Sequence, residues 1–204
     1  MATPRMVTML RPVLVLFAIL TLVTGVVYPA LVTGVGSLIF PAQVQGSLVR
    51  RDGQVVGSEL IAQSFQAPRN FWGRPSATAP KPYDAASSGG SNLGPLNPAL
   101  KTAVEERLAA LRTADPGNEL PVPVDLVTTS ASGLDPHITP AAALYQVARV
   151  ARERHLDPGK IGALVRAHIE PPTWGVLGEA RVNVLMLNLD LDRLESAAAR
   201  DRAQ

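Results

Sequence analysis

Apolar residues gather near the start of the chain, where residues 12–49 contain no Asp, Glu, Lys or Arg. Most positions from Val13 to Val27 are Val, Leu, Ile or Phe, each of which favours membrane insertion by roughly 0.3–0.6 kcal/mol. A helix over residues 13–32 is about 30 Å long, which matches the hydrocarbon layer of a bilayer. The pattern predicts one transmembrane helix, which we place at residues 12–35.

Two interpretations of this segment differ in whether it is retained. A cleaved signal peptide has a shorter apolar core, followed by small residues at the cleavage site. Here the apolar character continues to Phe40, and Tyr28 and Pro29 interrupt the nearest small-residue pattern, so a retained anchor is favoured. Pro29, with Gly34 and Gly36, is expected to loosen the helix where it leaves the bilayer.

Positive charge flanks the predicted span on one side only. Arg5, Arg11 and the terminal amine precede it, and no Lys or Arg follows before Arg50. By the positive-inside rule, residues 1–11 form a cytoplasmic tail and the chain beyond the span lies outside the cytoplasm. We expect a single-pass protein of the inner (plasma) membrane.

Turn residues organise the first part of the region beyond the span. Asp52-Gly53 suits a tight turn and separates two short segments, so a β-hairpin is predicted there. Residues 66–98 are rich in Pro, Gly, Ser and Asn without helical or strand periodicity, which predicts a long loop. Long loops inside compact domains are usually functional or disordered.

Three predicted helices begin with the same device, a capping residue followed by proline, at Asn97, Thr139 and Asp157. Each is followed by apolar residues at helical spacing. The three stripes are Leu100, Val104, Leu108 and Leu111; Leu144, Val147, Ala148 and Ala151; and Ile161, Leu164, Val165 and His168.

Residues 122–128 and 181–189 are rich in β-branched and apolar residues and are predicted to be strands. Residues 192–204 alternate charges and alanines, which indicates a solvated, fraying helical tail. The predicted fold is an α+β extracytoplasmic domain, residues 36–191, anchored by a single N-terminal transmembrane helix.

Composition excludes several classes of function. The formal net charge is +2 and aromatic residues make up 4% of the chain, so nothing indicates nucleic-acid binding. There is no cysteine, no H-E-x-x-H pattern and only three histidines, so we expect no metal site and no thiol catalysis. Neither a Walker lysine nor an Asp-Lys-Thr-Gly sequence occurs, so ATP hydrolysis is not expected.

A serine hydrolase is an alternative that the polar turn around Ser132 raises. Either Ser132 or Ser91 could act as nucleophile with His137 as base and Asp135 as the orienting acid. No G-x-S-x-G elbow is present, and residues 132–137 are better interpreted as a hydrogen-bonded turn that leads into the Thr139 cap.

The glycine-rich segment of the long loop offers a weak nucleotide-binding candidate, because successive backbone N–H groups can hold an anion. It lacks the lysine and the following helix of a P-loop, so an exacting loop conformation is the alternative explanation. The candidate residues are Ser88, Gly89, Gly90, Ser91 and Asn92.

Phe71, Trp72 and Arg74 lie within the irregular segment and combine residue types that are enriched at protein interfaces. With His137 they are our interface candidates. The alternative, which the sequence leaves open, is that Phe71 and Trp72 fill the core of a small domain.

Five ordered motifs carry a resemblance to a known family. They are residues 57–65, 71–77, 88–95, 131–142 and 178–185. Together with the N-terminal span, they resemble the C subunit of the bacterial Kdp potassium-transporting P-type ATPase over nearly the whole chain. Ala62, Thr139 and Ala180 depart from the residues that the family often has, but Thr139 can still cap a helix.

The resemblance implies a non-catalytic accessory subunit of a high-affinity potassium uptake complex. It implies two partners, a potassium-selective channel-like subunit and a P-type ATPase subunit, in addition to the lipid bilayer. It also implies a role in assembly and as a catalytic chaperone that raises the ATP affinity of the ATPase subunit. No tightly bound cofactor is expected, since ATP and potassium are handled by the complex. A domain outside the cytoplasm would affect ATP binding indirectly, through coupling between conformational states.

Overall fold

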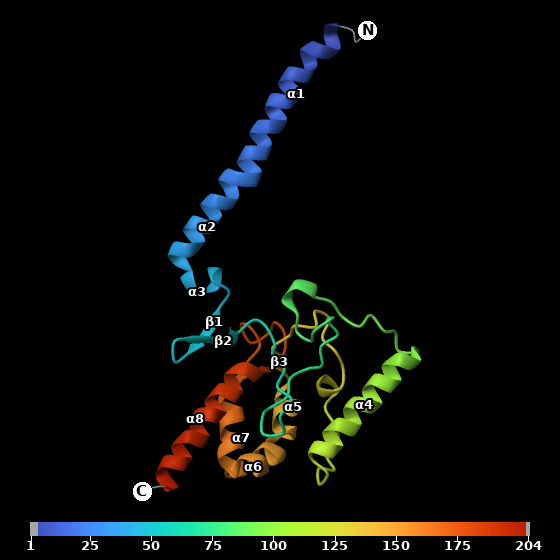
Figure 1. Ribbon diagram of the computed structural model, residues 1–204, viewed down its shortest axis with the longest axis vertical. Helices are drawn as coiled ribbons and strands as arrows, with labels where there is room; N and C mark the ends of the chain where they lie inside the picture. Colours follow the sequence, from blue (N-terminus) through green and yellow to red (C-terminus); the bar gives the residue numbers. More distant parts are fainter. Residues whose placement is uncertain (1–3, 203–204) are drawn as a thin grey trace. The chain divides into compact units, whose positions relative to one another are not determined.

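The computed structural model describes residues 4–202 and, within them, the side chains of residues 9–200. The chain divides into two compact units, residues 1–48 and residues 49–204, which we call the anchor and the C-terminal domain (Figure 1). The second unit combines helices with two small sheets. The α+β prediction with one N-terminal apolar helix is therefore confirmed.

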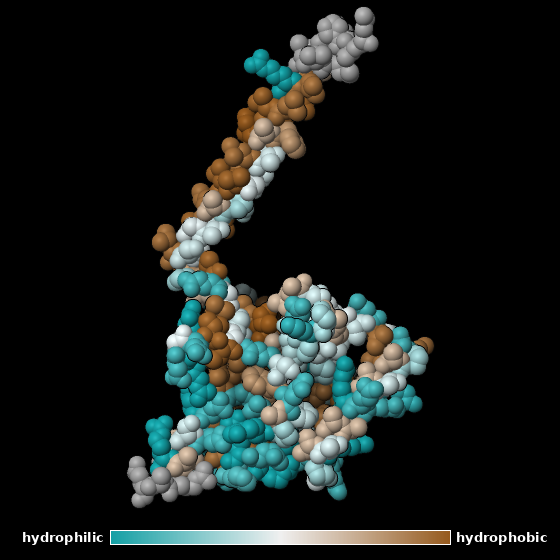
Figure 2. Space-filling view, viewed as in Figure 1, coloured by the Kyte–Doolittle hydropathy of each residue, from teal (hydrophilic) through white to brown (hydrophobic). Residues whose placement is uncertain are grey.

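The anchor is helical from Pro4 to Ile39. It consists of α1 (Pro4–Leu22), a π-helical turn (Val23–Val27) and α2 (Tyr28–Ile39). Its 31-residue segment Met9–Ile39 is long and apolar enough to cross a membrane, and it is about 46 Å long at 1.5 Å per residue. Figure 2 shows apolar side chains along this helix.

Pro29 disturbs the anchor helix on its N-terminal side. A proline has no N–H to donate, and its ring clashes with the carbonyl four residues earlier, here that of Gly25. The π-helical turn contains Gly25 and widens the helix there, with the Tyr28 N–H donating to the carbonyl of Val23. The expected loosening at Gly34 and Gly36 is wrong, because α2 continues through both.

The predicted hairpin is confirmed. A short helix α3 (Pro41–Val44) precedes strands β1 (Leu48–Arg51) and β2 (Gln54–Ser58), which pair with each other. Asp52 and Gly53, the two residues between the strands, have φ of 51° and 78°. Both are left-handed, as a two-residue turn requires.

A three-stranded antiparallel sheet lies within the C-terminal domain. Its order is β3 (His137–Ile138), β5 (Arg181–Asn183), β4 (Ile169–Glu170), with Val182 opposite Ile138 on one side and Ile169 on the other. Helices α5 (Pro140–Tyr145) and α8 (Val184–Arg202) contact β5, and α6 (Val147–Arg154) and α7 (Pro158–Ala167) pack against these helices. Helix α4 (Pro98–Ala114) lies on the opposite side of the domain from α8 (Figure 1).

All three predicted helix caps are confirmed. The side chain of Asn97 accepts from the N–H of Ala99, that of Thr139 from Ala142, and that of Asp157 from Lys160. The long loop is confirmed too, since residues 66–96 contain only the short 3-10 turn Ala85–Ser87.

The predicted strand over residues 181–189 is wrong beyond its third residue. The strand ends at Asn183, whose side chain accepts from the N–H of Met186 and so begins α8. The buried residues that follow have helical spacing, and a continuous apolar run does not by itself distinguish a buried strand from a buried helix. They are Val184, Leu185, Leu187, Asn188 and Leu191.

The predicted strand over residues 122–128 is also wrong, because this segment forms the 3-10 turn Val124–Leu126 and irregular chain. Pro121 and Pro123 lack the N–H groups that a central strand needs. The predicted tail is helical, but it belongs to α8, and Asp192 and Glu195 form ion pairs with the domain. Residues 203–204 lie outside the described part.

The core of the C-terminal domain joins the sheet to its helices. Its fully buried members include Phe71, Val150, Ile161, Val182 and Leu187. Phe71 lies in the long loop, whereas the other four lie in helices or in a strand. The loop is thereby fastened to the centre of the domain.

Candidate functional site

The candidate site is the long loop and the elements that hold it, beginning with Phe71. This side chain is fully buried, and its backbone is bracketed by the buried side chain of Asn188 on α8. The Phe71 N–H donates to Asn188 Oδ1 at 2.9 Å, and Asn188 Nδ2 donates to the Phe71 carbonyl at 2.9 Å. Phe71 therefore acts as a core residue and offers no surface to a partner.

Trp72 is held in the same manner by Gln146, between α5 and α6. The Trp72 N–H donates to Gln146 Oε1 at 2.8 Å, and Gln146 Nε2 donates to the Trp72 carbonyl at 3.1 Å. The indole N–H donates to Ala67, and the Arg149 guanidinium lies 4.5 Å from the ring centroid. Trp72 is half-buried and fully engaged within the domain.

Two buried arginines fasten the start of the loop, and neither was predicted from the sequence. Arg149 is 2% exposed and donates to the carbonyls of Pro68 and Asn70 and to Gln146 Oε1. Burial lowers its pKa to about 10, even though the charge of Asp115 raises it. The helical spacing could have indicated that Arg149 is buried, because Arg149 follows Gln146 and Ala142 on the buried face of the helices.

Arg154 is 3% exposed and joins three parts of the domain. It donates to the Arg69 carbonyl and to Asn70 Oδ1 in the loop, each at 2.7 Å. It also donates to Asp192 and Glu195 on α8 at 2.7 Å, so a buried cation has two carboxylate partners. The charged residues at the end of the chain thus help to position the loop.

The glycine-rich segment packs tightly against the turn at residues 131–133. Ser88 Oγ and the Gly89 N–H both donate to the Ser132 carbonyl, at 3.1 and 2.9 Å. A Cβ on Gly90 would lie 2.9 Å from the Ala131 carbonyl oxygen. The glycine is therefore required by close approach of the two backbones, and the Gly89 N–H is already used inside the protein.

The other two residues of this candidate are Ser91 and Asn92. Ser91 Oγ accepts from the Thr129 hydroxyl at 3.3 Å, and Asn92 has a left-handed φ of 51°. Both support an exacting loop conformation, which was the alternative to nucleotide binding.

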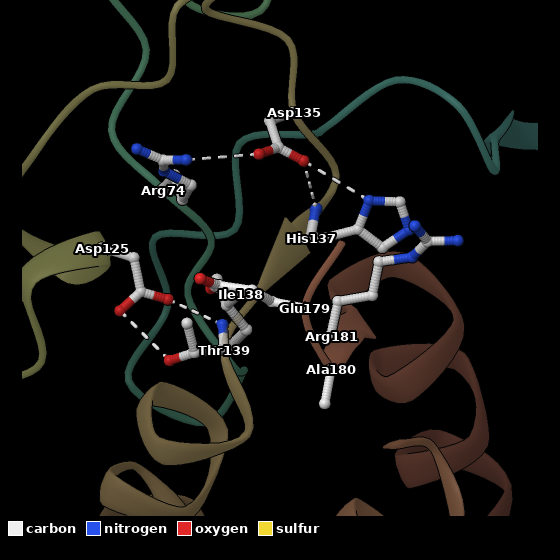
Figure 3. A pocket seen from close by; sticks show the side chains of 9 residues that line it. All are labelled: Arg74, Asp125, Asp135, His137, Ile138, Thr139, Glu179, Ala180 and Arg181. Atoms are coloured by element: carbon white, nitrogen blue, oxygen red, sulfur yellow. Dashed lines mark hydrogen bonds and ion pairs between the residues drawn. The ribbon is translucent and has the colours of Figure 1, made fainter. Parts of the chain in front are cut away.

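Arg74, Asp135 and His137 come together in the structure, as Figure 3 shows. Asp135 lies 3.3 Å from Arg74 Nη1 and 3.4 Å from His137 Nδ1, and it accepts from the His137 N–H at 3.0 Å. Burial raises the pKa of Asp135, but the hydrogen bonds and charge of His137, with the charge of Arg74, outweigh burial and lower the pKa. Two of the interface candidates thus share one carboxylate.

This cluster lines an open cavity of about 300 Å³ beside β3 and β5. Asp125 lies on its wall and accepts from the Thr139 N–H at 2.7 Å, which fixes the turn into α5. Arg74 also donates to the Thr129 carbonyl. The charged side chains of the cavity are therefore used mainly to hold chain turns together.

The hydrolase alternative has no support in this geometry. Ser132 Oγ accepts from the Leu134 N–H at 3.1 Å and closes a turn. In the described part of the chain, neither Ser132 nor Ser91 hydrogen-bonds His137, so the nucleophile–base pair is not assembled. The same part contains no group of three or more His, Asp or Glu residues that could hold a metal ion.

An apolar helix long enough to cross a membrane, joined to a small α+β domain whose polar clusters hold its own loops, fits a membrane-anchored accessory subunit. The comparisons identify which one. The family model described as K+-transporting ATPase, c chain (KdpC), matches residues 10–193, so the chain belongs to this family.

Curated relatives agree over nearly their full length. The chain is 64% identical to the potassium-transporting ATPase KdpC subunit of Variovorax paradoxus over 191 residues, which cover 94% of the chain and 98% of the relative. Identity to the KdpC subunit of Polaromonas naphthalenivorans is 64% over 95% of the chain and 99% of the relative. For Methylococcus capsulatus it is 59%, over 93% and 100%. The resemblance inferred from the motifs is confirmed.

Proposed function

We propose that this chain is the non-catalytic accessory subunit of a Kdp-type potassium uptake complex. Its partners are a potassium-selective channel-like subunit and an ATP-hydrolysing P-type subunit. The observation that carries the proposal is the family match, which takes in both the apolar anchor and the C-terminal domain. Ion selectivity belongs to the channel-like partner, because potassium filters are rings of backbone carbonyls.

The proposed topology puts the N-terminus in the cytoplasm and the C-terminal domain outside it. Arg11 precedes the charge-free segment, and the next positive residue is Arg50. The chain has no cysteine, so single-cysteine variants report topology directly. Leu96 is 97% exposed and Val182 is fully buried, which makes them a matched pair of labelling positions.

In intact spheroplasts, a membrane-impermeant maleimide should label Leu96→Cys, whereas Thr3→Cys should react only after lysis. Val182→Cys should remain unlabelled in both conditions, which controls for unfolding. Labelling of Thr3→Cys in intact spheroplasts, with Leu96→Cys protected, would show that the topology is the reverse of the one proposed.

The effect on ATP is proposed to be indirect. A domain outside the cytoplasm cannot reach nucleotide, and the Gly89 N–H that a phosphate would need donates to Ser132 instead. Removing the subunit should therefore raise the KM of the ATPase subunit for ATP, through coupling between conformational states. Ser91→Ala should leave this KM unchanged, whereas a direct nucleotide site in the loop would make that variant raise it.

Assembly is tested with the whole complex. A tagged chain should co-purify with both partners and support potassium uptake, while a chain that lacks residues 1–40 should do neither. Normal assembly and uptake by the truncated chain would contradict a role for the anchor.

A further inference from the structure

An exposed apolar hairpin connects β4 to β5. It comprises residues 171–178, which we call the Trp174 hairpin. The side chains of Trp174, Val176 and Leu177 are 87%, 79% and 55% exposed. Large apolar side chains grouped on one loop mark a surface that is covered by something else.

Hydrogen bonds within the hairpin satisfy four of its backbone N–H groups. Thr173 and Leu177 exchange two N–H to carbonyl bonds, at 2.9 and 3.0 Å. The N–H of Gly175 donates to the Pro172 carbonyl, and that of Val176 to Thr173. These internal bonds lower the cost of moving the turn into an apolar environment, because the four N–H groups keep their partners there.

Trp174 occupies the tip in a conformation that few bulky residues adopt. Its φ is 54°, and that of the following Gly175 is 78°. A left-handed tryptophan is an outlier, and such strain commonly accompanies a functional constraint. The conformation keeps the indole outside the domain.

The composition of the hairpin suits a bilayer surface better than water. No charged residue occurs from Pro171 to Gly178, and the charges that follow begin at Glu179. Tryptophan concentrates at membrane–water interfaces, where its apolar ring and its polar N–H are both satisfied. Flanking aliphatic side chains add the apolar contact that interfacial segments use.

The covalent chain keeps the domain close to a membrane. Residues 40–47 separate the end of the anchor helix at Ile39 from β1 at Leu48, which limits the separation to roughly 30 Å. A domain of residues 49–204 has a radius of gyration of about 15 Å. The domain is therefore held close to the bilayer surface, at high effective concentration.

We propose that the Trp174 hairpin inserts its tip into the interfacial layer of the bilayer that the anchor spans. The occupant of this apolar surface is thus phospholipid, and the hairpin is a second, shallow membrane contact. The proposal requires no partner subunit and holds on whichever side of the membrane the domain lies, so it is independent of the proposed function.

The chain contains only two tryptophans, which makes the test direct. The full chain is reconstituted alone in nanodiscs of phosphatidylethanolamine and phosphatidylglycerol with brominated acyl chains. In Trp72→Phe, the brominated lipid should quench roughly half of the fluorescence of the remaining Trp174, since an interfacial tip lies about 5–10 Å deep. Its emission should also lie at shorter wavelength than that of a tryptophan peptide in water. In Trp174→Phe, the half-buried Trp72 should be quenched little.

Subtracting the Trp174→Phe signal from that of the unsubstituted chain gives the same information if Trp72→Phe does not fold. Val176→Glu should abolish most of the quenching, because it places a charge in the inserted tip. Leu96→Glu, a matched apolar-to-acidic change at an exposed loop, should have no effect.

Three results would overturn the proposal. The first is a Trp174 that is unquenched and water-exposed in the nanodisc. The second is protection of Trp174 only in the assembled complex, which would assign the hairpin to a partner subunit. The third is equal loss of quenching in Leu96→Glu, which would indicate general adsorption of the domain.

Discussion

Asn188→Ala is the most informative change in the domain, because one side chain satisfies both backbone groups of buried Phe71. Removing it leaves an N–H and a carbonyl without partners at a residue that is fully buried. At about 1–3 kcal/mol for each unsatisfied group, the free energy of unfolding should fall by about 2–6 kcal/mol. Domains of this kind are stable by only roughly 5–15 kcal/mol.

Urea unfolding of the full chain in detergent, followed by tryptophan fluorescence, measures this loss. With an m-value of about 2 kcal/mol per molar urea, the midpoint should fall by about 1–3 M. Asn97→Ala is the matched control, because Asn97 only caps the exposed start of α4 and is worth about 1 kcal/mol. Equal midpoints for the two variants would refute the bracketing role of Asn188.

Three further changes test the residues that hold the long loop in place. Arg154→Met should lower the thermal unfolding midpoint, by about 1.5–3 kcal/mol in stability, because it removes the charge-assisted hydrogen bonds that join the loop to α8, although Asp192 and Glu195 keep their ion pairs with Arg51 and Arg69; calorimetry that shows no shift would contradict this. Gly90→Ala should cost about 1–3 kcal/mol because its Cβ would meet the Ala131 carbonyl at 2.9 Å, whereas Gly94→Ala, with open space around it, should be nearly neutral in the same urea assay. The lowered pKa of Asp135 contributes stability that is present above about pH 4 and is lost as pH falls through the folded-state pKa. Asp135→Asn should therefore unfold in acid without this contribution to the pH dependence of its stability. An acid transition identical to that of the unsubstituted chain would contradict the role of Asp135 between Arg74 and His137.

Local features were predictable because neighbouring residues decide them. The hairpin follows from Asp52-Gly53, and the helix starts follow from Asn97, Thr139 and Asp157, each of which bonds within three residues. The strands predicted at residues 122–128 and 181–189 were wrong for the opposite reason. Residues 184–189 are apolar enough for either structure, and their helical state depends on packing against distant elements.

The interface candidates show that residue type alone does not distinguish a binding surface from a core. Phe71 and Trp72 have the composition of a binding surface, yet Asn188 and Gln146 hold their backbones inside the domain. Asn188 and Gln146 could have indicated this, because they are polar residues on otherwise buried helical faces and need hydrogen-bond partners there. Each pair is separated by more than 70 residues, so no local pattern reveals it.

The sequence by itself determined the apolar anchor, the α+β class, the caps and the family, because these depend on local spacing and on ordered motifs. The tertiary structure was needed to show that Arg149 and Arg154 fasten the long loop, that Ser132 does not hydrogen-bond His137 in the described part of the chain, and that Trp174 faces outwards. The physical reason is common to all three. Burial and hydrogen-bond partners are properties of the packed chain, and a residue acquires them from elements far away in sequence.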